Sequence, residues 1–475
     1  MSQQVDTIHP EYREVVCRWE LVRAIINNNA QELIRKPDIN DPVRTKQYRQ
    51  DAILTNFTNL TKVGLTGLVF RKDPKIELPP ELEYLEDDMT GSGINHNQFA
   101  QKVVGDVLQT GRYGLLVDYY NDGMKAYVKP YAAESIINWK TRQVNGECVL
   151  SLVVLKEQVL DDENDIFSQE TKVQYRVLFL NELDKYEQLV YNDGCELVER
   201  ITPTDYNNNL FDKLPFIFIG SENNDSCIDY QPLYDMAIVN LGHYRNSADY
   251  EESIYISGQP YLVVNIGDMS KDDFDNANPN GVQMGSRKGL VVNSNGGATL
   301  LQANANQLAA QAMKEKLEQA AAIGARLIAP AGGRETAEAA RIRYGSQYSA
   351  LYTLGNNVEE GIEAALELAC MFMGADPEMV EYELNDQYYD DTADPNLVAQ
   401  QIMLLDRGVI SADVIRDYGR RTGFISDGMS NEDMQNAVDL SMNPLDGMIN
   451  DNAQGSNPSP STPPNADGED TGQDN

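Results

Sequence analysis

The sequence predicts an α+β fold in which helical regions lie on both sides of a strand-rich segment. Apolar residues recur at helical spacing in the first 66 residues and again from residue 228 onward. Between residues 113 and 220 the period changes to two, and turns of Asn, Asp and Gly separate the apolar runs. The 475 residues suffice for about two to four domains, and the hydrophobic content of 41% is ample for a core.

The N-terminal region, residues 8–66, is predicted to be mostly helical with a break at Pro37 and Pro42. Beyond the break, a helical run begins near Tyr48 and extends to about Gly67. Its apolar positions are four, three and four residues apart, at Ile53, Phe57, Leu60 and Gly64. A further helix is expected at about 96–111, because Gly111 is a suitable C-cap.

The strand-rich segment is predicted to be mostly antiparallel and to comprise about 100 residues. Turn residues divide it into six candidate strands, which are Gly114–Tyr119, Ala126–Val128, Val149–Leu155, Gln174–Leu180, Lys185–Tyr191 and Phe216–Ile219. A helix then returns at Ile228–Glu252, with Pro232 close to its start.

The remainder of the chain alternates loops with helices. A loop-and-strand region at 253–303 contains the apolar runs Pro260–Asn265 and Gly289–Asn293. The strongest helical pattern, rich in Ala, Gln, Lys and Glu, covers about 304–329 and ends at the break Pro330–Gly333. Further helices are expected at 335–373, 394–407, 411–421 and 430–440. The final stretch, 442–475, has no Lys or Arg and is expected to be disordered.

The charge balance is strongly acidic. The chain has 38 Lys and Arg against 74 Asp and Glu, for a formal charge of −36. A simple duplex-DNA binder has the opposite sign, because its affinity comes mainly from cations that neutralise phosphates. The acidity leaves three interpretations: solubility and self-repulsion, a partner with basic surfaces, or a passage to which DNA must not adhere.

No cofactor, metal or catalytic site is predicted. The five Cys form no CxxC pair, and with three His there is no zinc-ligand spacing, so free thiols in a reducing cytoplasm are expected. Carboxylate pairs such as Asp390-Asp391 are typical of solvated acidic loops, and neither a phosphate-binding GK[ST] motif nor a GxSxG elbow is present. The protein is therefore interpreted as a non-enzymatic subunit.

The sequence also predicts where the protein is located. Its first residues lack the basic start and apolar run of a signal peptide, and no stretch approaches the roughly 20 apolar residues that span a bilayer. A protein kept in the cytoplasm, or packed into something assembled there, is expected.

One segment departs from the overall acidity. Residues 314–343 contain six cations and four carboxylates, a local charge of +2. The cations are Lys314, Lys316, Arg326, Arg334, Arg341 and Arg343. Arg326 and Arg334 flank the break at 330–333, which would make a flexible basic loop between two helices. The alternative is ordinary helix surface charge with pairs such as Lys314–Glu318.

The order of these parts resembles the portal protein, or head-to-tail connector, of tailed bacteriophages. Several phrases strengthen the resemblance: Leu214–Ile219 (LPFIFI) followed by Asp229–Met236 (DYQPLYDM) and Asn246–Asp249 (NSAD); Ala339–Gly345 (AARIRYG); Gly408–Ser411 (GVIS) with Gly419; Asn56–Thr58 (NFT) with Gly67–Lys72 (GLVFRK); and Tyr113–Tyr119 (YGLLVDY) with Ile136–Trp139 (IINW). The layout matches over most of residues 10–440, and the shared order of diffuse phrases carries the resemblance.

The resemblance implies a portal-like α+β fold, with a helical stem, a strand-rich clip, a mixed α/β wing and an α-helical crown. Its parts would be a wing at 1–228, a first stem helix at 229–252, a clip at 253–303, a second stem helix at 304–328, a tunnel loop and long wing helix at 329–379, a crown at 380–441 and a disordered acidic tail at 442–475. The tunnel loop would lie near 329–337.

The resemblance also implies a role and partners. The chain would form a twelve-subunit ring at one capsid vertex in the virion, next to the major capsid protein, after assembly in the host cytoplasm. Double-stranded DNA would pass through its channel during packaging and ejection. The terminase large subunit would dock at the clip, and a head–tail adaptor would bind later.

Two hypotheses about residues follow. The small Ala320 and Gly324 would allow close packing of the stem helices in a ring. Lys314, Lys316, Arg326, Arg334, Arg341 and Arg343 are the candidate DNA-channel residues, making transient phosphate contacts in an otherwise repulsive acidic tunnel. The alternatives are a non-portal assembly or head–tail adaptor protein, which gives no reason for the helix–clip–helix–loop order, and an acidic hydrolase, which needs convergent carboxylates.

Overall fold

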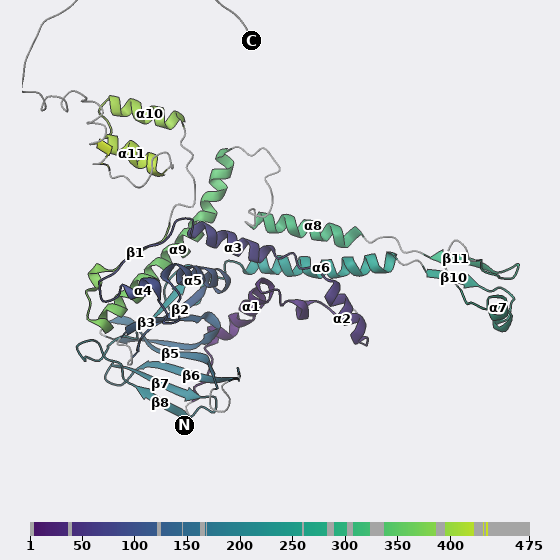
Figure 1. Cartoon of the computed structure of the whole chain (residues 1–475), viewed down its shortest axis with the longest axis horizontal. Helices are drawn as coiled ribbons and strands as arrows, with labels where there is room; N and C mark the ends of the chain where they lie inside the picture. The colour runs from purple at the N-terminus through teal and green to yellow at the C-terminus, as the bar shows by residue number, and fades with distance from the viewer. Residues whose placement is uncertain are drawn as a thin grey trace, which may run out of the picture. The chain divides into compact units, whose positions relative to one another are not determined.

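The computed structural model describes residues 4–36, 40–120, 125–144, 146–161, 167, 169–258, 261–282, 289–301, 307–323, 337–385, 395–421, 431, 434 and 435. The chain divides into two units, Met1–Tyr388 and Tyr389–Asn475. The first unit combines helices with antiparallel sheets, which confirms the predicted α+β class (Figure 1).

The N-terminal helices are α1 (Pro10–Ile26), α2 (Pro42–Asp51) and α3 (Phe57–Val69), with a short 3-10 turn, η1, at Gln31–Leu33. Pro42 opens α2 as predicted, whereas Pro37 lies outside the described residues. The single helical run predicted from Tyr48 to Gly67 is wrong, since it is broken after Asp51. Asn56 causes the second start, because its side chain accepts a hydrogen bond from the Asn59 N–H at 3.0 Å and caps α3.

After α3 come a short strand β1 (Lys75–Glu77), α4 (Tyr84–Asp87) and α5 (His96–Thr110). The predicted C-cap is confirmed, because Gly111 has a φ of 69° and its N–H donates to the Val107 carbonyl at 2.8 Å. A Cβ at this position would lie 2.5 Å from the Tyr230 carbonyl oxygen, so the position needs glycine for space as well as for conformation.

Two antiparallel sheets form the strand-rich segment. The first has the order β3 (Lys125–Ala132), β2 (Arg112–Tyr120), β9 (Phe216–Gly220). The second is a meander of β4 (Ile136–Val144), β5 (Glu147–Leu160), β6 (Thr171–Leu180), β7 (Tyr186–Asn192) and β8 (Leu197–Ile201). The six predicted strands are present, five with longer bounds and one, predicted at Lys185–Tyr191, shifted by one residue. Two strands were missed: β8 is largely exposed and lacks an apolar pattern, and β4 is interrupted by register shifts.

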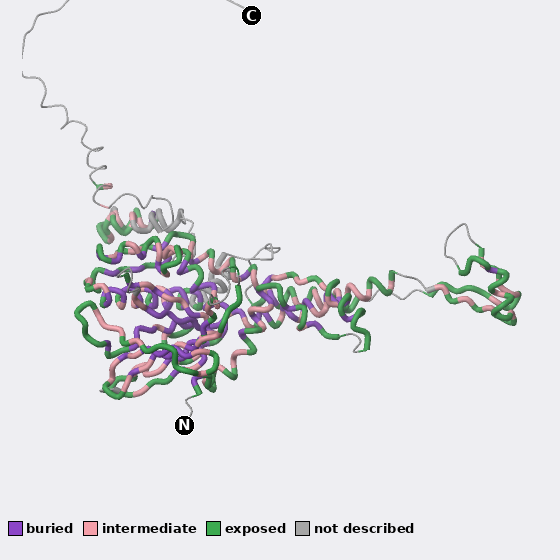
Figure 2. The backbone as a smooth tube through the Cα atoms, turned by 60° about the horizontal axis from the view of Figure 1, so that its bottom comes forward, coloured by how far each residue is buried: buried purple, intermediate pink, exposed green. Residues whose placement is uncertain are grey.

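The core lies between the sheets and the helices that cover them. Helix α9 (Ala337–Met373) packs against β2, β3 and β9, and a large apolar cluster joins it to α1, α5 and both sheets. Figure 2 shows the buried residues gathered in this body. A smaller cluster, which includes Val177 and Leu189, lies among β5, β6 and β7.

A helix, a strand-rich insert and a second helix follow β9. They are α6 (Tyr234–Gly258), β10 (Tyr261–Asn265), α7 (Lys271–Ala277), β11 (Gly297–Leu301) and α8 (Gln307–Ala322). β10 and β11 pair antiparallel, from Tyr261 opposite Leu301 to Asn265 opposite Gly297. α6 and α8 lie side by side, as Figure 1 shows.

One prediction for this region is wrong, and others are refined. Helix α6 begins at Tyr234 and ends at Gly258, later at both ends than 228–252, because residues 228–233 are held as a loop in which the Leu233 N–H donates to the Leu108 carbonyl. Helix α7 was missed. The run 289–293 is not a strand, since Val291 is bonded through both its N–H and its carbonyl to the Asn278 side chain. Helix α8 is described only over Gln307–Ala322, within the predicted 304–329.

The last elements of the first unit are η3 (Pro377–Met379) and β12 (Glu381–Glu383), which pairs antiparallel with β1. The second unit contains α10 (Pro395–Asp406) and α11 (Ala412–Arg421), close to the predicted 394–407 and 411–421. The predicted helix at 430–440 and the tail at 442–475 lie almost wholly outside the described residues. None of the described helices has an apolar stretch long enough to cross a membrane.

Candidate functional site

The candidate site is the helix pair α6–α8, where the described members of the predicted residue set lie. Lys314, Lys316 and Ala320 are on α8. Arg326, Arg334 and Gly324, with the predicted tunnel loop around them, lie outside the described residues. Arg341 and Arg343 belong to α9, but the structure describes only their main chain. The predicted basic cluster therefore remains a prediction.

Ala320 joins the helix pair to the N-terminal helices. It is 1% exposed and forms a small buried cluster with Met236 of α6 and Phe57 of α3, and Val239 packs against this cluster. A small side chain suits this position because three elements meet there within one chain. Its packing role between chains is not tested by this contact.

The two lysines of α8 have different environments. Lys314 is exposed, whereas Lys316 is half-buried and its side chain crosses α6 at Gly242. A Cβ at Gly242 would lie 2.7 Å from the Lys316 Cε, so glycine makes room for the lysine. The next residue, His243, is buried, and burial together with the charge of Lys316 lowers the pKa of its imidazole. Neither lysine forms an ion pair within the described part of the chain.

Helix α6 is fixed to the N-terminal region by buried polar side chains that the sequence analysis missed. Asn240 accepts hydrogen bonds from the Thr58 N–H and hydroxyl and donates to the Thr55 carbonyl at 2.9 Å. Ser247 both accepts from the Ile53 N–H and donates to the Ile53 carbonyl. The sequence does contain a sign of these anchors, because Asn240 and Ser247 occupy positions on the buried face of α6 where apolar residues are usual.

The ends of the helices and the insert expose many apolar side chains. Eight of them have exposed fractions between 39% and 63%, and they are Ile254, Tyr255, Ile256, Val263, Leu300, Leu301, Leu317 and Ile323. These exposed apolar residues lie on the end of α6, on β10 and β11, and on and just after α8.

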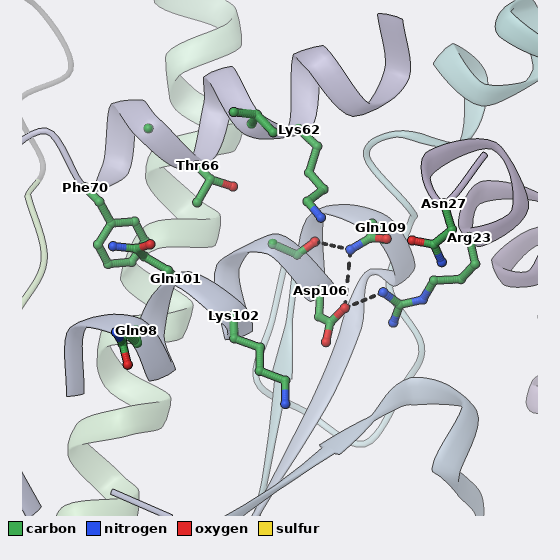
Figure 3. A pocket seen from close by; sticks show the side chains of 13 residues that line it. Arg23, Asn27, Lys62, Thr66, Phe70, Gln98, Gln101, Lys102, Asp106 and Gln109 are labelled. Carbon is green, nitrogen blue, oxygen red and sulfur yellow. Dashed lines mark hydrogen bonds and ion pairs between the residues drawn. The ribbon is translucent and has the colours of Figure 1, made fainter. Parts of the chain in front are cut away.

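A second candidate is a polar groove of about 780 Å³ between α1, α3 and α5 (Figure 3). Arg23 is ion-paired there with Asp106 and with Glu134, and Gln109 donates to Asp106 and to the Gly105 carbonyl. Lys62 points toward Gln109 in Figure 3, and burial lowers the pKa of its ammonium group. The only carboxylate that lines the groove, Asp106, is thus occupied by Arg23 and Gln109.

This groove has little capacity for chemistry. Its residues offer no nucleophile beside a free base, and no cluster of potential metal ligands occurs in the described ranges. Its polar lining suits water or a polar segment. The arrangement of the helix pair, with buried anchors and exposed apolar ends, is the more informative feature.

Comparison with known proteins identifies one family over this region. Residues 232–373 match the family described as Domain of unknown function (DUF4055). The matched residues run from the start of α6 through the insert and α8 to the end of α9. No curated protein matches the chain.

Several solved structures are similar at low identity. The neck of an empty gene transfer agent (GTA) particle, computed with C6 symmetry, has a TM-score of 0.42 at 13% identity, covering 84% of this chain and 94% of that chain. The neck of a native GTA particle, computed with C12 symmetry, has a TM-score of 0.40 at 13% identity, covering 79% and 93%. A HK97-family phage portal protein from Corynebacterium diphtheriae has a TM-score of 0.32 at 12% identity, covering 71% and 96%. The similar structures thus include a phage portal protein, the family that the sequence resembles.

Proposed function

We propose that the chain is a structural, non-enzymatic subunit of a portal ring at one capsid vertex, and that DNA passes through the centre of this ring. Each subunit would contribute α6 and α8 as its stem and the insert from β10 to β11 as its clip. The α/β body would be the wing, and α10 with α11 would belong to the crown. Docking of a packaging motor and a head–tail adaptor is part of the same proposal.

The observation that carries the proposal is the helix–insert–helix unit. Two antiparallel helices are joined by a segment that contains a two-stranded ribbon, and the 37-residue helix α9 is the next described element of the chain. Ala320 lies against Met236, and Lys316 crosses Gly242. The two contacts occur in opposite sequence order on α8 and α6, so the helices are antiparallel. Such a pair can be repeated around an axis, because each copy buries only part of each helix within its own chain.

Charge supports the proposed channel. The formal charge of −36 per chain, multiplied around a ring, would repel DNA and let it slide without adhesion. In the proposal, Arg326, Arg334 and Lys314 supply a few transient phosphate contacts within this acidic surface. The exposed apolar residues of α6, the insert and α8 would be covered by neighbouring subunits.

The mass of the purified protein in solution tests the proposal. A portal subunit is expected to form closed assemblies of about twelve copies, since closed rotational symmetry satisfies every interface. A stable monomer or dimer over the whole accessible concentration range would contradict the ring. An open-ended series of masses would instead indicate a filament-forming scaffold.

A second experiment addresses the channel. Replacing Arg326 and Arg334 with Glu is expected to alter DNA packaging or retention while the rings remain intact. Unchanged packaging by the double variant would reject the phosphate contacts and leave the ring proposal standing.

A further inference from the structure

A small pocket of about 210 Å³ lies where α2, α6 and α8 meet, and its lining is unusually basic for this chain. Three cations and one carboxylate line it, with Tyr48 and Gly242 among the other residues. The cations are Arg35, Arg245 and Lys316, and the carboxylate is Asp249.

The single carboxylate of the pocket, Asp249, accepts a hydrogen bond from the Tyr48 hydroxyl at 2.5 Å, and Arg245 uses its Nε to donate to the Leu33 carbonyl at 3.1 Å. Within the described residues, Arg35, Arg245 and Lys316 have no ion pair, whereas nearby cations such as Arg44 do. Three cations against one carboxylate leave the pocket with a formal charge of +2 in a chain that has 74 carboxylates and 38 cations, which indicates a site for an anion.

The lysine of the pocket crosses α6 at a glycine. A Cβ at Gly242 would lie 2.7 Å from the Lys316 Cε, so a larger residue there would displace the lysine. His243 is buried next to Lys316, and burial and this lysine lower the pKa of its imidazole, which disfavours a further positive charge beside the pocket.

The opposite side of α8 has the complementary charge. At 100° per residue, Glu318 lies about 200° around the helix from Lys316, and Glu315 lies about 100° away. Both are exposed, while Ala309 and Ala320, on the same stripe as Lys316, are buried. Glu318 has no ion pair among the described residues.

We propose that this basic pocket receives the carboxylate of Glu318 from α8 of a second copy of the chain, with Glu315 beside it. The proposal rests on the proposed ring and names its electrostatic contact. A pocket on one side of α8 and an acid on the other give a head-to-tail interface, the kind that closes into a ring. It assigns Lys316 to a subunit contact instead of the DNA contact expected from the sequence.

A carboxylate fits this pocket better than a nucleic acid does. The pocket is small and concave, whereas a duplex presents a long convex row of phosphates. Asp249 lines the pocket and Glu252 acts electrostatically on its Tyr48, and both would repel such a row. One acidic side chain flanked by apolar neighbours such as Leu317 avoids most of this repulsion.

Charge exchange tests the pairing. The variants are Lys316→Glu, Glu318→Lys and the double exchange, with Lys314→Glu as the control, because Lys314 is an exposed cation two residues from Lys316. Association is measured by native mass spectrometry near the concentration at which half of the wild-type protein is assembled. Each single exchange is expected to weaken association about tenfold or more, the double exchange to recover most of it, and Lys314→Glu to stay within about threefold of wild type.

The outcomes separate this inference from the proposed function. If wild-type rings form and the Lys316 and Glu318 variants assemble like the Lys314 control, the pocket contact is wrong while the ring stands. If the wild-type protein forms no ring, both proposals fail.

Failure of the double exchange to recover association rejects Glu318 as the partner. Weaker duplex-DNA binding by Lys316→Glu with unchanged rings would identify a phosphate as the occupant. Glu318 is exposed, so Glu318→Lys is expected to fold and to show the effect on subunit association even if Lys316→Glu folds poorly.

Discussion

At the scale of single residues, Glu157 on β5 shows how the acidic chain uses a buried carboxylate. Lys129, Gln174 and Arg176 bond to it from neighbouring strands at 2.8, 2.5 and 2.9 Å, and Tyr131 bonds to it as well. Burial alone would raise the pKa of Glu157, but the ion pairs with Arg176 and Lys129 outweigh it and lower the pKa to about 2. This network joins β3 of one sheet to β5 and β6 of the other.

The lowered pKa of Glu157 predicts how stability depends on pH. Because the pKa lies below its ordinary value of 4.5, the stabilisation is complete above that pH and is lost as the pH falls toward 2. Glu157→Gln is expected to cost about 3–5 kcal/mol at pH 7, since Arg176 is left without its partner, and progressively less in acid. Urea unfolding at several pH values measures this. The exposed Glu199→Gln on β8 is the control, expected within about 0.5 kcal/mol of wild type. Equal losses for Glu157→Gln at pH 7 and pH 3 would contradict the assignment.

Gly111 gives a second prediction at this scale. Its positive φ strains any other residue, and a Cβ would also meet the Tyr230 carbonyl at 2.5 Å. Gly93 has a similar φ of 81° with open space around it, so Gly93→Ala measures conformational strain alone. Gly111→Ala is expected to lower the free energy of unfolding by more than the roughly 1–2 kcal/mol of Gly93→Ala. Similar losses in the two variants would show that the loop at Tyr230 moves away freely.

At the scale of elements, the fit of α8 against α6 and α3 depends on the small size of Ala320. Ala320→Leu would force extra volume into the cluster with Phe57 and Met236, and a loss of about 1–3 kcal/mol is expected. The control is Ala322→Leu, at an exposed position near the end of the same helix. Hydrogen exchange of the α8 amides provides a local readout, and faster exchange is expected only for Ala320→Leu. Unchanged exchange in α8 would mean that the cluster does not hold this helix.

The elements also show what sequence patterns could and could not predict. Helix α5 with its Gly111 cap, helix α9 and the six apolar strands were predicted, because local period and turn chemistry determine them. The start of α6 was misplaced because residues 228–233 are held by hydrogen bonds to distant elements, from the Leu233 N–H to the Leu108 carbonyl and from the Ser221 hydroxyl to the Tyr230 carbonyl. Strand β8 was missed because an exposed edge strand carries no apolar alternation.

The candidate site was predictable in part for the same reason. The importance of Ala320 follows from its small size at a helical apolar position. In contrast, the pocket of Arg35, Arg245 and Lys316 brings together residues 281 positions apart in the chain, from Arg35 to Lys316, and no local pattern connects them. Asn240 and Ser247 bond to main-chain groups of residues 53–58, and such partners cannot be read from the sequence of α6 alone.

At the scale of the whole molecule, the chain combines a strong negative charge with apolar surface on its helix pair and insert. A net charge of −36 keeps isolated subunits apart, while the exposed apolar residues favour association along defined faces. Self-association in a fixed geometry would reconcile the two, with carboxylates left on the surfaces that DNA passes. In the proposed ring, α6 and α8 of successive subunits would therefore surround an axial channel.

An electron cryomicroscopy reconstruction of the purified assembly tests this claim most directly. We expect a closed ring with an axial opening, in which α6 and α8 of every subunit border the opening and Glu318 of one copy lies in the basic pocket of the next. A ring in which the sheets border the axis and the α6–α8 pair points outward would contradict it, as would particles without an opening.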